Sequence, residues 1–359
     1  MKIGIMTFHF AYNYGAALQA YGLCTFLRKN GYDAMIIDYM PKELEHLYTL
    51  NPFCVSRKKE IFSKLKKYFH CKKQFKKFDN FLEKNDLCTD KIDRDKLSNL
   101  NNIFDVFIVG SDQIWNPKIL TDSAPYYLDF VTSDRRKIAY AASFGVNKLS
   151  PENFEKSKEN LKQFDWISIR EKSGVDIVNN VDINAELISD PVFLLDKDDW
   201  ELLENPVDIP KHFIFYYALE YNADLDRKAI ELSQQEKAKI VIVHSTCERI
   251  SKISDGIRMD NIGPEEFLYL MRNAAYVITD SFHATAFGLI FSKNIINISS
   301  ETRSMRAKNL LLNVGLENCI NENEIIVQGN ENIGKKITDM RKYASNRLLN
   351  VGLNQGEFL

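Results

Sequence analysis

The sequence has 359 residues, which is enough for about two domains of roughly 150 residues each. Its hydrophobic content of 45% is typical of a soluble globular protein, and its net charge of −2 argues against a dedicated nucleic-acid binder. The six cysteines are scattered without a C-x-x-C pair, which indicates neither a zinc site nor a disulfide framework and favours reduced thiols in a cytoplasmic protein.

Short apolar runs alternate with helical patterns over residues 1–200. The expected strands are Ile3–Thr7, Ala34–Asp38, Val106–Val109, Lys137–Ala142, Trp166–Ile169 and Leu187–Ser189, and the first helix is expected from about Ala16 to Lys29. The first run is too short for a signal peptide, and no stretch approaches the ~20 apolar residues of a membrane span. Strands that alternate with helices indicate βαβ units and a mostly parallel sheet.

Residues 57–77 differ in composition, because ten of them are Lys or Arg. Phe62, Leu65 and Phe69 fall at helical spacing within this segment. One interpretation is a basic amphipathic helix that touches an anionic membrane or a lipid-linked substrate. The simpler interpretation is a solvated helical excursion whose aromatic side chains pack on the domain.

A polar stretch with Pro206 and Pro210 separates this half from a second one, in which the alternation restarts. Strands are expected at Phe213–Ala218, Lys239–His244, Tyr276–Thr279 and Ile295–Ile298, and helices near Asp224–Glu236, Pro264–Asn273 and Thr285–Phe291. The pattern predicts two doubly wound α/β halves that face a cleft, residues 1–200 and 205–335, followed by a terminal helix over residues 336–359.

The segment Ala275–Gly288 carries the strongest functional signal. Its apolar first half reads as a strand, and Ser281 is suited to cap a helix that follows directly. His283 is therefore expected at the carboxyl end of a strand, where open α/β sheets bind ligands and where free helical amides favour an anion. An ionisable histidine there is a candidate acid or base, and Asp280 is close enough to hold it charged.

Polar residues also follow strands in the first half. The candidates are Asn13 and Gly15, which open the first helix, and Ser111, Asp112 and Gln113, which follow Gly110. Small residues let a ligand approach a helix N-terminus, but neither a dinucleotide fingerprint nor a P-loop is present. The structural alternatives are an ordinary turn at Gly15 and a turn cap at Asp112.

Ser143 and Arg170 end two further expected strands. Packing is an alternative for Ser143, while the guanidinium of Arg170 suits a carboxylate or phosphate ligand, or else a salt bridge within the fold. Arg303 and Arg306 share one helical face, and either add positive charge to the cleft or cap a surface. Asp190, which precedes a proline, is interpreted as a structural turn residue.

Several of these segments, in this order, resemble the polysaccharide pyruvyl transferase family. They are Gly15–Tyr21, Gly110–Pro117, Tyr140–Gly145, Ser168–Ser173, Asp190–Pro191 and Thr279–Ala284, within a resemblance that covers residues 1 to about 312. It implies a GT-B-like fold of two Rossmann-like domains. It also implies transfer of a pyruvyl group from phosphoenolpyruvate to two hydroxyls of a sugar, which gives a cyclic ketal and phosphate in the building of bacterial exopolysaccharides, capsules and cell-wall polymers. Asp280 and Ala284 stand where many members have Asn and Gly.

The resemblance suggests a role for each candidate. A protonated His283 would supply a proton to the enol carbon. Arg170 would hold phosphate or carboxylate, and Asp112 is a weak candidate for the base. The expected substrate-binding residues are Asn13, Gly15, Ser111, Gln113, Ser143, Ser281, Arg303 and Arg306. No metal or cofactor is expected besides the donor, and the sugar acceptor is free or lipid-linked, at the inner face of the membrane. The alternatives are a nucleotide-sugar glycosyltransferase of the same architecture and a non-catalytic sugar-binding relative.

Overall fold

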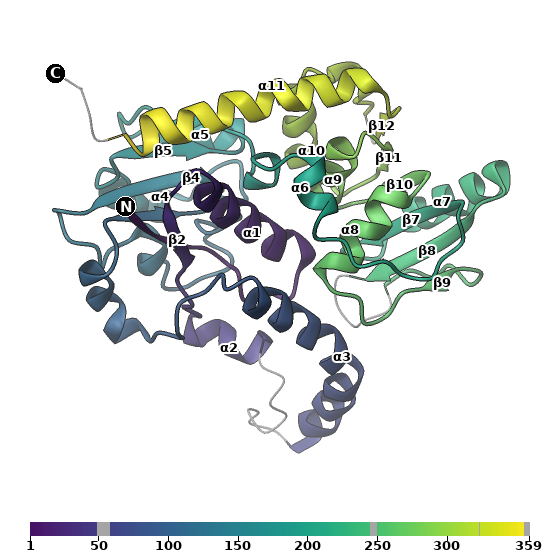
Figure 1. Ribbon diagram of the computed structural model, residues 1–359, viewed down its shortest axis with the longest axis horizontal. Coiled ribbons are helices and arrows are strands. Elements are labelled where there is room, and N and C mark those ends of the chain that lie inside the picture. The colour runs from purple at the N-terminus through teal and green to yellow at the C-terminus, as the bar shows by residue number, and fades with distance from the viewer. Residues whose placement is uncertain (49–57, 245–249, 323, 355–359) are drawn as a thin grey trace.

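The computed structural model describes residues 1–48, 58–244, 250–322 and 324–354, without the side chains of residues 46, 47, 58–70 and 301–303. Within these ranges the strands form two six-stranded sheets, one in each half of the chain (Figure 1). None of the helices in these ranges is long and apolar enough to cross a membrane.

The first sheet has the order β2-β1-β3-β4-β5-β6, and all its strands are parallel. The bounds are β1 Lys2–Met6, β2 Asp33–Ile36, β3 Val106–Val109, β4 Arg136–Ala142, β5 Trp166–Ile169 and β6 Glu186–Leu187. The direction of strand order reverses at β1 and β3, which are neighbours. The loops after these two strands therefore diverge, and such a switch point is where open α/β sheets bind ligands.

The second sheet has the order β12-β11-β10-β7-β8-β9. Its bounds are β7 Phe213–Ala218, β8 Lys239–His244, β9 Ile257–Arg258, β10 Tyr276–Thr279, β11 Asn294–Asn297 and β12 Ile325–Val327. Only β12 among these is antiparallel to its neighbour. The order reverses at β7 and β10, so the second switch point lies at the end of the strand that leads to His283.

The helices cover both faces of the sheets. Their bounds are α1 Tyr14–Lys29, α2 Lys42–Tyr48, α3 Lys58–Lys84, α4 Pro151–Leu161, α5 Lys172–Asn179, α6 Lys197–Glu201, α7 Ala223–Glu236, α8 Pro264–Asn273, α9 Phe282–Ile290, α10 Glu301–Val314 and α11 Glu331–Arg347. The strands at Val106–Val109 and Tyr276–Thr279 agree with the expected bounds. The short β9 and β12 were not expected, because strands this short show too little periodicity.

The two halves share one hydrophobic core. The ring of Tyr14 on α1 stacks on that of Phe267 on α8, with centroids 4.5 Å apart, and Trp200 packs edge-on against Phe287 on α9 at 5.0 Å. These side chains belong to a buried cluster that continues from the first sheet to the second. Such continuous packing fixes the loops at the ends of the two sheets relative to each other.

The terminal helix joins the halves a second time. It begins at Glu331, and it runs from the second half back over the first (Figure 1). At its end the guanidinium of Arg347 pairs with Glu186 on β6, and Arg341 donates to the carbonyl of Phe193 at 3.3 Å. α11 therefore contacts both halves and links them.

The basic segment forms most of α3. Phe62, Leu65 and Phe69 lie outside the described side chains, so their packing remains a prediction. Further along, Lys77 pairs with Glu266 of α8 at 2.5 Å, and Phe78 and Phe81 are buried. The described end of α3 thus contacts the second half. Cys71 on this helix takes part in a disulfide, contrary to the expectation of reduced thiols, whereas Cys24, Cys88 and Cys319 are free.

Candidate active site

His283 lies in the first turn of α9, directly after β10. Ser281 is the N-cap of this helix, since it has extended backbone angles and its Oγ accepts a hydrogen bond from the amide of Ala284 at 3.4 Å. The amide of Ser281 in turn donates to Oγ1 of Thr279 at 3.0 Å. The predicted substrate contact at Ser281 is thus occupied by capping, and its effect is to hold His283 at the end of the sheet.

Gly15 lies against the ring of His283. A Cβ at this position would be 2.0 Å from the Nδ1 of His283, so a larger residue would displace the imidazole. Asn13 caps the helix below, with its Oδ1 accepting from the amides of Gly15 and Ala16 at 2.9 and 3.2 Å. The first turn of α1 in one half therefore contacts the first turn of α9 in the other, and the two switch points form one site.

Asp190 faces His283 from the other side. Its Oδ2 lies 3.6 Å from Nε2 of His283 and accepts hydrogen bonds from Arg170 at 2.8 Å and from Ser111 at 3.2 Å. Burial alone would raise the pKa of Asp190, but the nearby charges of His283 and Arg170 lower that pKa well below its usual value. Asp190 is therefore a buried, ionised carboxylate beside the histidine. The sequence predicts a structural turn residue at this position, although Asp190 also follows the strand at the edge of the first sheet.

Arg170 is enclosed by acidic side chains. Its side chain is 2% exposed, and its Nη1 donates to Asp190 while its Nη2 donates to Asp112 at 3.1 Å. Its Nε lies 3.7 Å from the carboxylate of Glu171, and the guanidinium carbon lies 4.9 Å from the ring centroid of Phe282. Of the two interpretations of Arg170, the salt bridge within the fold describes this geometry, because the fork is engaged by carboxylates of the chain itself.

The loop after β3 supplies Ser111 to the cluster in addition to Asp112. Ser111 donates from Oγ to Asp190 and to the carbonyl of Ala141 at 2.6 Å. Gln113 instead packs on Gly145, where a Cβ would lie 2.1 Å from its Oε1. The Oγ of Ser143 accepts from the amide of Gly145 at 3.1 Å. Ser111 thus reaches the centre of the site, whereas Gln113 and Ser143 hold the neighbouring loops together.

The arginines of α10 approach the same cluster. Arg306 is half-buried and lies near Glu171. Burial raises the pKa of Glu171, and the charges of Arg170 and Arg306 act in the opposite direction without reversing this rise. The side chain of Arg303 lies outside the described residues. α10 therefore brings at least one positive charge to the edge of the site.

Asp280 accepts hydrogen bonds from the backbone that directly follows β7. Its two carboxylate oxygens accept from the backbone amides of Leu219 at 2.7 Å and Glu220 at 3.3 Å. The expectation that Asp280 holds His283 charged is therefore corrected. The carboxylate next to the imidazole nitrogen is Asp190, because α9 packs against the first half at this point.

Buried polar atoms without a hydrogen-bond partner gather at this cluster. Among the described residues they include Nε2 of His283, Nε of Arg170 and Oε2 of Glu171. Two of these atoms face each other, Nε of Arg170 and Oε2 of Glu171 at 3.7 Å, and Nε2 of His283 lies 3.6 Å from Asp190. These ion pairs are longer than a hydrogen bond, so a bound polar molecule can complete the bonding of these atoms. An imidazole beside an ionised carboxylate can exchange a proton with that molecule. No group of three or more potential metal ligands occurs among the described side chains.

Comparison with known proteins agrees with this architecture. A family model described as polysaccharide pyruvyl transferase matches residues 13–302. A structure from Listeria monocytogenes, described as a UDP-N-acetylglucosamine 2-epimerase, has a TM-score of 0.54 at 11% identity and covers 100% of this chain and 99% of its own. A UDP-GlcNAc 2-epimerase from Neisseria meningitidis has a TM-score of 0.48 at 11% identity over 98% and 100% of the chains. MurG from Acinetobacter baumannii gives 0.40 at 10% identity over 98% of each. No curated protein matches the sequence. At 11% identity the Listeria structure shows the fold alone, which is GT-B-like as expected.

Proposed function

Because the chain belongs to the polysaccharide pyruvyl transferase family, we propose that it moves a pyruvyl group from phosphoenolpyruvate onto two hydroxyls of one sugar. The product is a cyclic ketal, and phosphate is released. The proposed acceptor is a sugar of a cell-surface polysaccharide or of its lipid-linked precursor, which would place the reaction in the cytoplasm at the inner face of the membrane. The observation that carries the proposal is the buried Nε2 of His283, which has no hydrogen-bond partner among the described residues and lies 3.6 Å from Asp190.

The proposed reaction needs one proton donor and one acceptor at the site. A proton adds to C3 of phosphoenolpyruvate and makes C2 electrophilic, and the first sugar hydroxyl bonds to C2 and loses its proton. The bond between C2 and the phosphate oxygen then breaks, and the second hydroxyl closes the ring and loses its proton. Of the two hydroxyl protons, one balances the proton on C3 and the other leaves with phosphate.

His283 is the proposed donor to C3. The ionised carboxylate of Asp190 stabilises a positive charge on the imidazole by direct attraction, since both groups are shielded from water. Arg170 and Ser111 hold that carboxylate in place through hydrogen bonds. In this arrangement Asp190 and Arg170 act as positioning residues, because they touch His283 or each other before they touch a substrate.

Different residues are proposed to bind the anionic donor and to act as the base. Phosphoenolpyruvate carries several negative charges, which favour the helix start at His283 and the positive charge of Arg306. Arg303 remains a predicted contact of the same helix. Asp112 is the most accessible of the carboxylates around Arg170, with 18% of its side chain exposed against 0% for Asp190 and 5% for Glu171. We therefore keep Asp112 as the proposed base for the sugar hydroxyls.

A phosphate-release assay with phosphoenolpyruvate and a panel of acceptor glycosides tests the proposal. We expect turnover with at least one acceptor, and a loss of about 10²–10⁴-fold in His283→Ala. The control is His212→Ala, an exposed histidine bonded to the carbonyl of Glu236 in the second half. Stabilisation of the fold by UDP- or GDP-sugars but not by phosphoenolpyruvate would instead support a nucleotide-sugar glycosyltransferase. His283→Ala with the wild-type rate would refute the acid role.

A further inference from the structure

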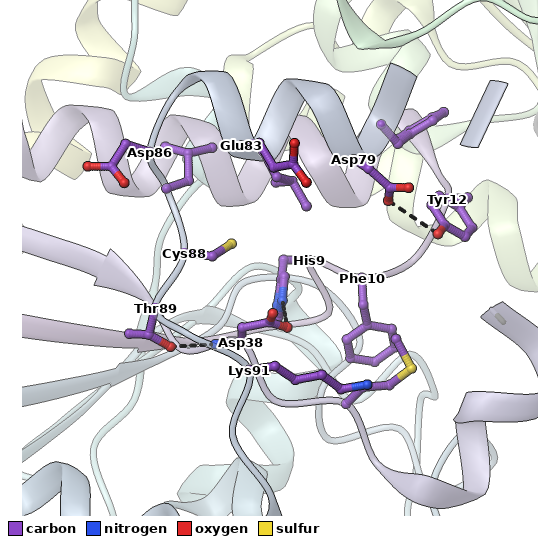
Figure 2. A pocket seen from close by; sticks show the side chains of 14 residues that line it. His9, Phe10, Tyr12, Asp38, Asp79, Glu83, Asp86, Cys88, Thr89 and Lys91 are labelled. Carbon is purple, nitrogen blue, oxygen red and sulfur yellow. Dashed lines mark hydrogen bonds and ion pairs between the residues drawn. The ribbon is translucent and has the colours of Figure 1, made fainter. Parts of the chain in front are cut away.

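A cavity of about 500 Å³ lies beside the β1–α1 loop (Figure 2). Its lining comes from this loop, from Asp38 after β2, from the end of α3, and from the segment 87–91 that follows α3. A volume of a few hundred Å³ is in the usual range for small-molecule sites. None of the candidate residues for the transfer reaction lines this cavity.

The floor of the cavity is a fixed pair of polar side chains. His9 is 3% exposed, and its Nε2 lies 3.1 Å from Oδ1 of Asp38 while its Nδ1 lies 3.2 Å from the carbonyl oxygen of Thr7. Both ring nitrogens of His9 are therefore engaged by oxygen atoms of the fold, and the ring is held in one orientation. The backbone amide of Asp38 donates to Oγ1 of Thr89 at 3.1 Å, which fixes the backbone that carries this carboxylate.

The rim of the cavity is acidic. Asp79 and Glu83 line it from α3, Asp86 lines it from the turn after this helix, and Lys91 lies opposite on the following segment (Figure 2). With Asp38, four carboxylates face one lysine and the histidine. Such a lining repels phosphoenolpyruvate and other anions, whereas carboxylate oxygens accept hydrogen bonds from hydroxyl and amine groups.

Aromatic side chains complete the wall. Phe10 and Tyr12 line the cavity from the β1–α1 loop, and Tyr12 donates its hydroxyl hydrogen bond to Asp79 at 3.2 Å. Apolar and aromatic faces next to a few placed polar groups are the usual composition of a site for a small polar ligand. A sugar has this dual character, because its ring carries both C–H faces and hydroxyl groups.

The cavity is connected to the reaction site through the chain. Thr7, whose carbonyl bonds His9, donates from its own Oγ1 to the carbonyl of Ser111 at 3.3 Å, and Ser111 bonds Asp190. The loop that carries His9 also continues directly to Gly15, which supports the ring of His283. The loop that lines the cavity therefore also supports the proposed centre of pyruvyl transfer.

We propose that this cavity binds a neutral or amine-bearing sugar unit of the acceptor glycan. The proposal rests on the proposed function, since it assigns the acceptor of that same reaction. The acidic rim separates the two substrates, because it admits hydroxyl and amine groups and rejects the anionic donor, which belongs beside His283 and Arg306.

Two variants and direct binding measurements test this site. Saturation-transfer NMR with methyl glycosides of glucose, galactose, mannose, glucosamine and N-acetylglucosamine reports sugar binding without any reaction. Leu82→Trp fills the cavity from α3, and we expect about tenfold weaker binding of any sugar that the wild type binds. Glu83→Lys changes an exposed rim position near the end of α3, where a lysine suits the helix dipole and leaves the fold intact. Its matched control is Glu155→Lys on α4, which is exposed and outside the cavity.

Kinetics connect the site to the acceptor. We expect Leu82→Trp and Glu83→Lys to raise KM for the acceptor, while KM for phosphoenolpyruvate stays within about twofold. Failure of every glycoside to bind, or binding that is equal in wild type and Leu82→Trp, overturns the proposal. Sugar binding that Leu82→Trp weakens, without phosphate release from phosphoenolpyruvate for any acceptor, overturns the pyruvyl transfer and leaves the sugar site standing. Phosphate release with an unchanged acceptor KM in both variants overturns the sugar site alone.

Discussion

The imidazole of His283 rests on the backbone of Gly15, so closely that a Cβ at position 15 would lie 2.0 Å from Nδ1. One residue begins α1 in the first half, and the other begins α9 in the second. A Cβ atom and a ring nitrogen cannot approach so closely, so only glycine at position 15 is compatible with the observed position of the His283 ring. The proposed acid is therefore positioned by the packing between the halves.

Gly15→Ala should lower both activity and stability. Alanine favours an α-helix over glycine by up to about 1 kcal/mol, but a methyl group forced into a buried contact typically costs about 1–3 kcal/mol. The added methyl group displaces His283, and a shift of about 1 Å in a reacting group can cost ~10²-fold in rate. Phosphate release and the thermal midpoint measure the two effects.

The matched control for this change is Gly334→Ala in α11. There the nearest atom to a new Cβ, outside the helix itself, is Oγ of Ser292 at 3.7 Å, an ordinary contact. We expect the control to keep the wild-type rate. A wild-type rate in Gly15→Ala would show that the placement of His283 against α1 has no part in the reaction.

Asp190→Ala should damage both fold and function. It leaves the guanidinium of Arg170 buried without its closest partner, and removal of one member of a buried ion pair costs about 3–5 kcal/mol. Asp190→Asn keeps one acceptor oxygen, which can serve Arg170 or the amide of Val192 but not both, so it should lose less stability than Asp190→Ala while still losing the charge beside His283. Urea unfolding and phosphate release distinguish the two variants, and Asp224→Asn on the surface of α7 is the control. Full activity in Asp190→Asn would remove the positioning role.

The same carboxylate should make stability depend on acidity. The pKa of Asp190 is lower in the folded protein than in the unfolded chain. A group of this kind contributes stability above its unfolded pKa of about 3.9 and loses that contribution as the pH falls through the folded pKa. The free energy of unfolding should therefore fall more steeply below about pH 5 in the wild type than in Asp190→Asn. Equal slopes in the two proteins would contradict the ionised state of Asp190.

The fold was accessible from sequence where a buried strand has clear limits. Val106–Val109 is an uninterrupted apolar run between Asp105 and Gly110, and its bounds were predicted correctly. β9 and β12 contain two and three residues, and their place depends on pairing with β8 and β11 and not on any local pattern.

The site was accessible in part for a similar reason. Strand ends identify which residues reach the edge of a sheet, and this rule brought out His283, Gly15 and Ser111. It could not show which carboxylate meets the imidazole, because Asp190 and Asp280 both follow strands and only the packing of α9 on the first half decides between them. The enclosure of Arg170 likewise depends on side chains far apart in sequence.

Asp280→Asn provides a test of this distinction between the two carboxylates. The asparagine carbonyl can still accept from the amide of Leu219, so we expect activity within about threefold of the wild type and an unchanged pH profile of kcat. Asp280→Ala removes both acceptors and should lower the free energy of unfolding by about 1–3 kcal/mol, because the amides of Leu219 and Glu220 lose their partner. A shifted pH profile in Asp280→Asn, with stability unchanged, would show that Asp280 and not Asp190 controls the charge of His283. The comparison is direct, since Asp190→Asn should change the profile and Asp280→Asn should not.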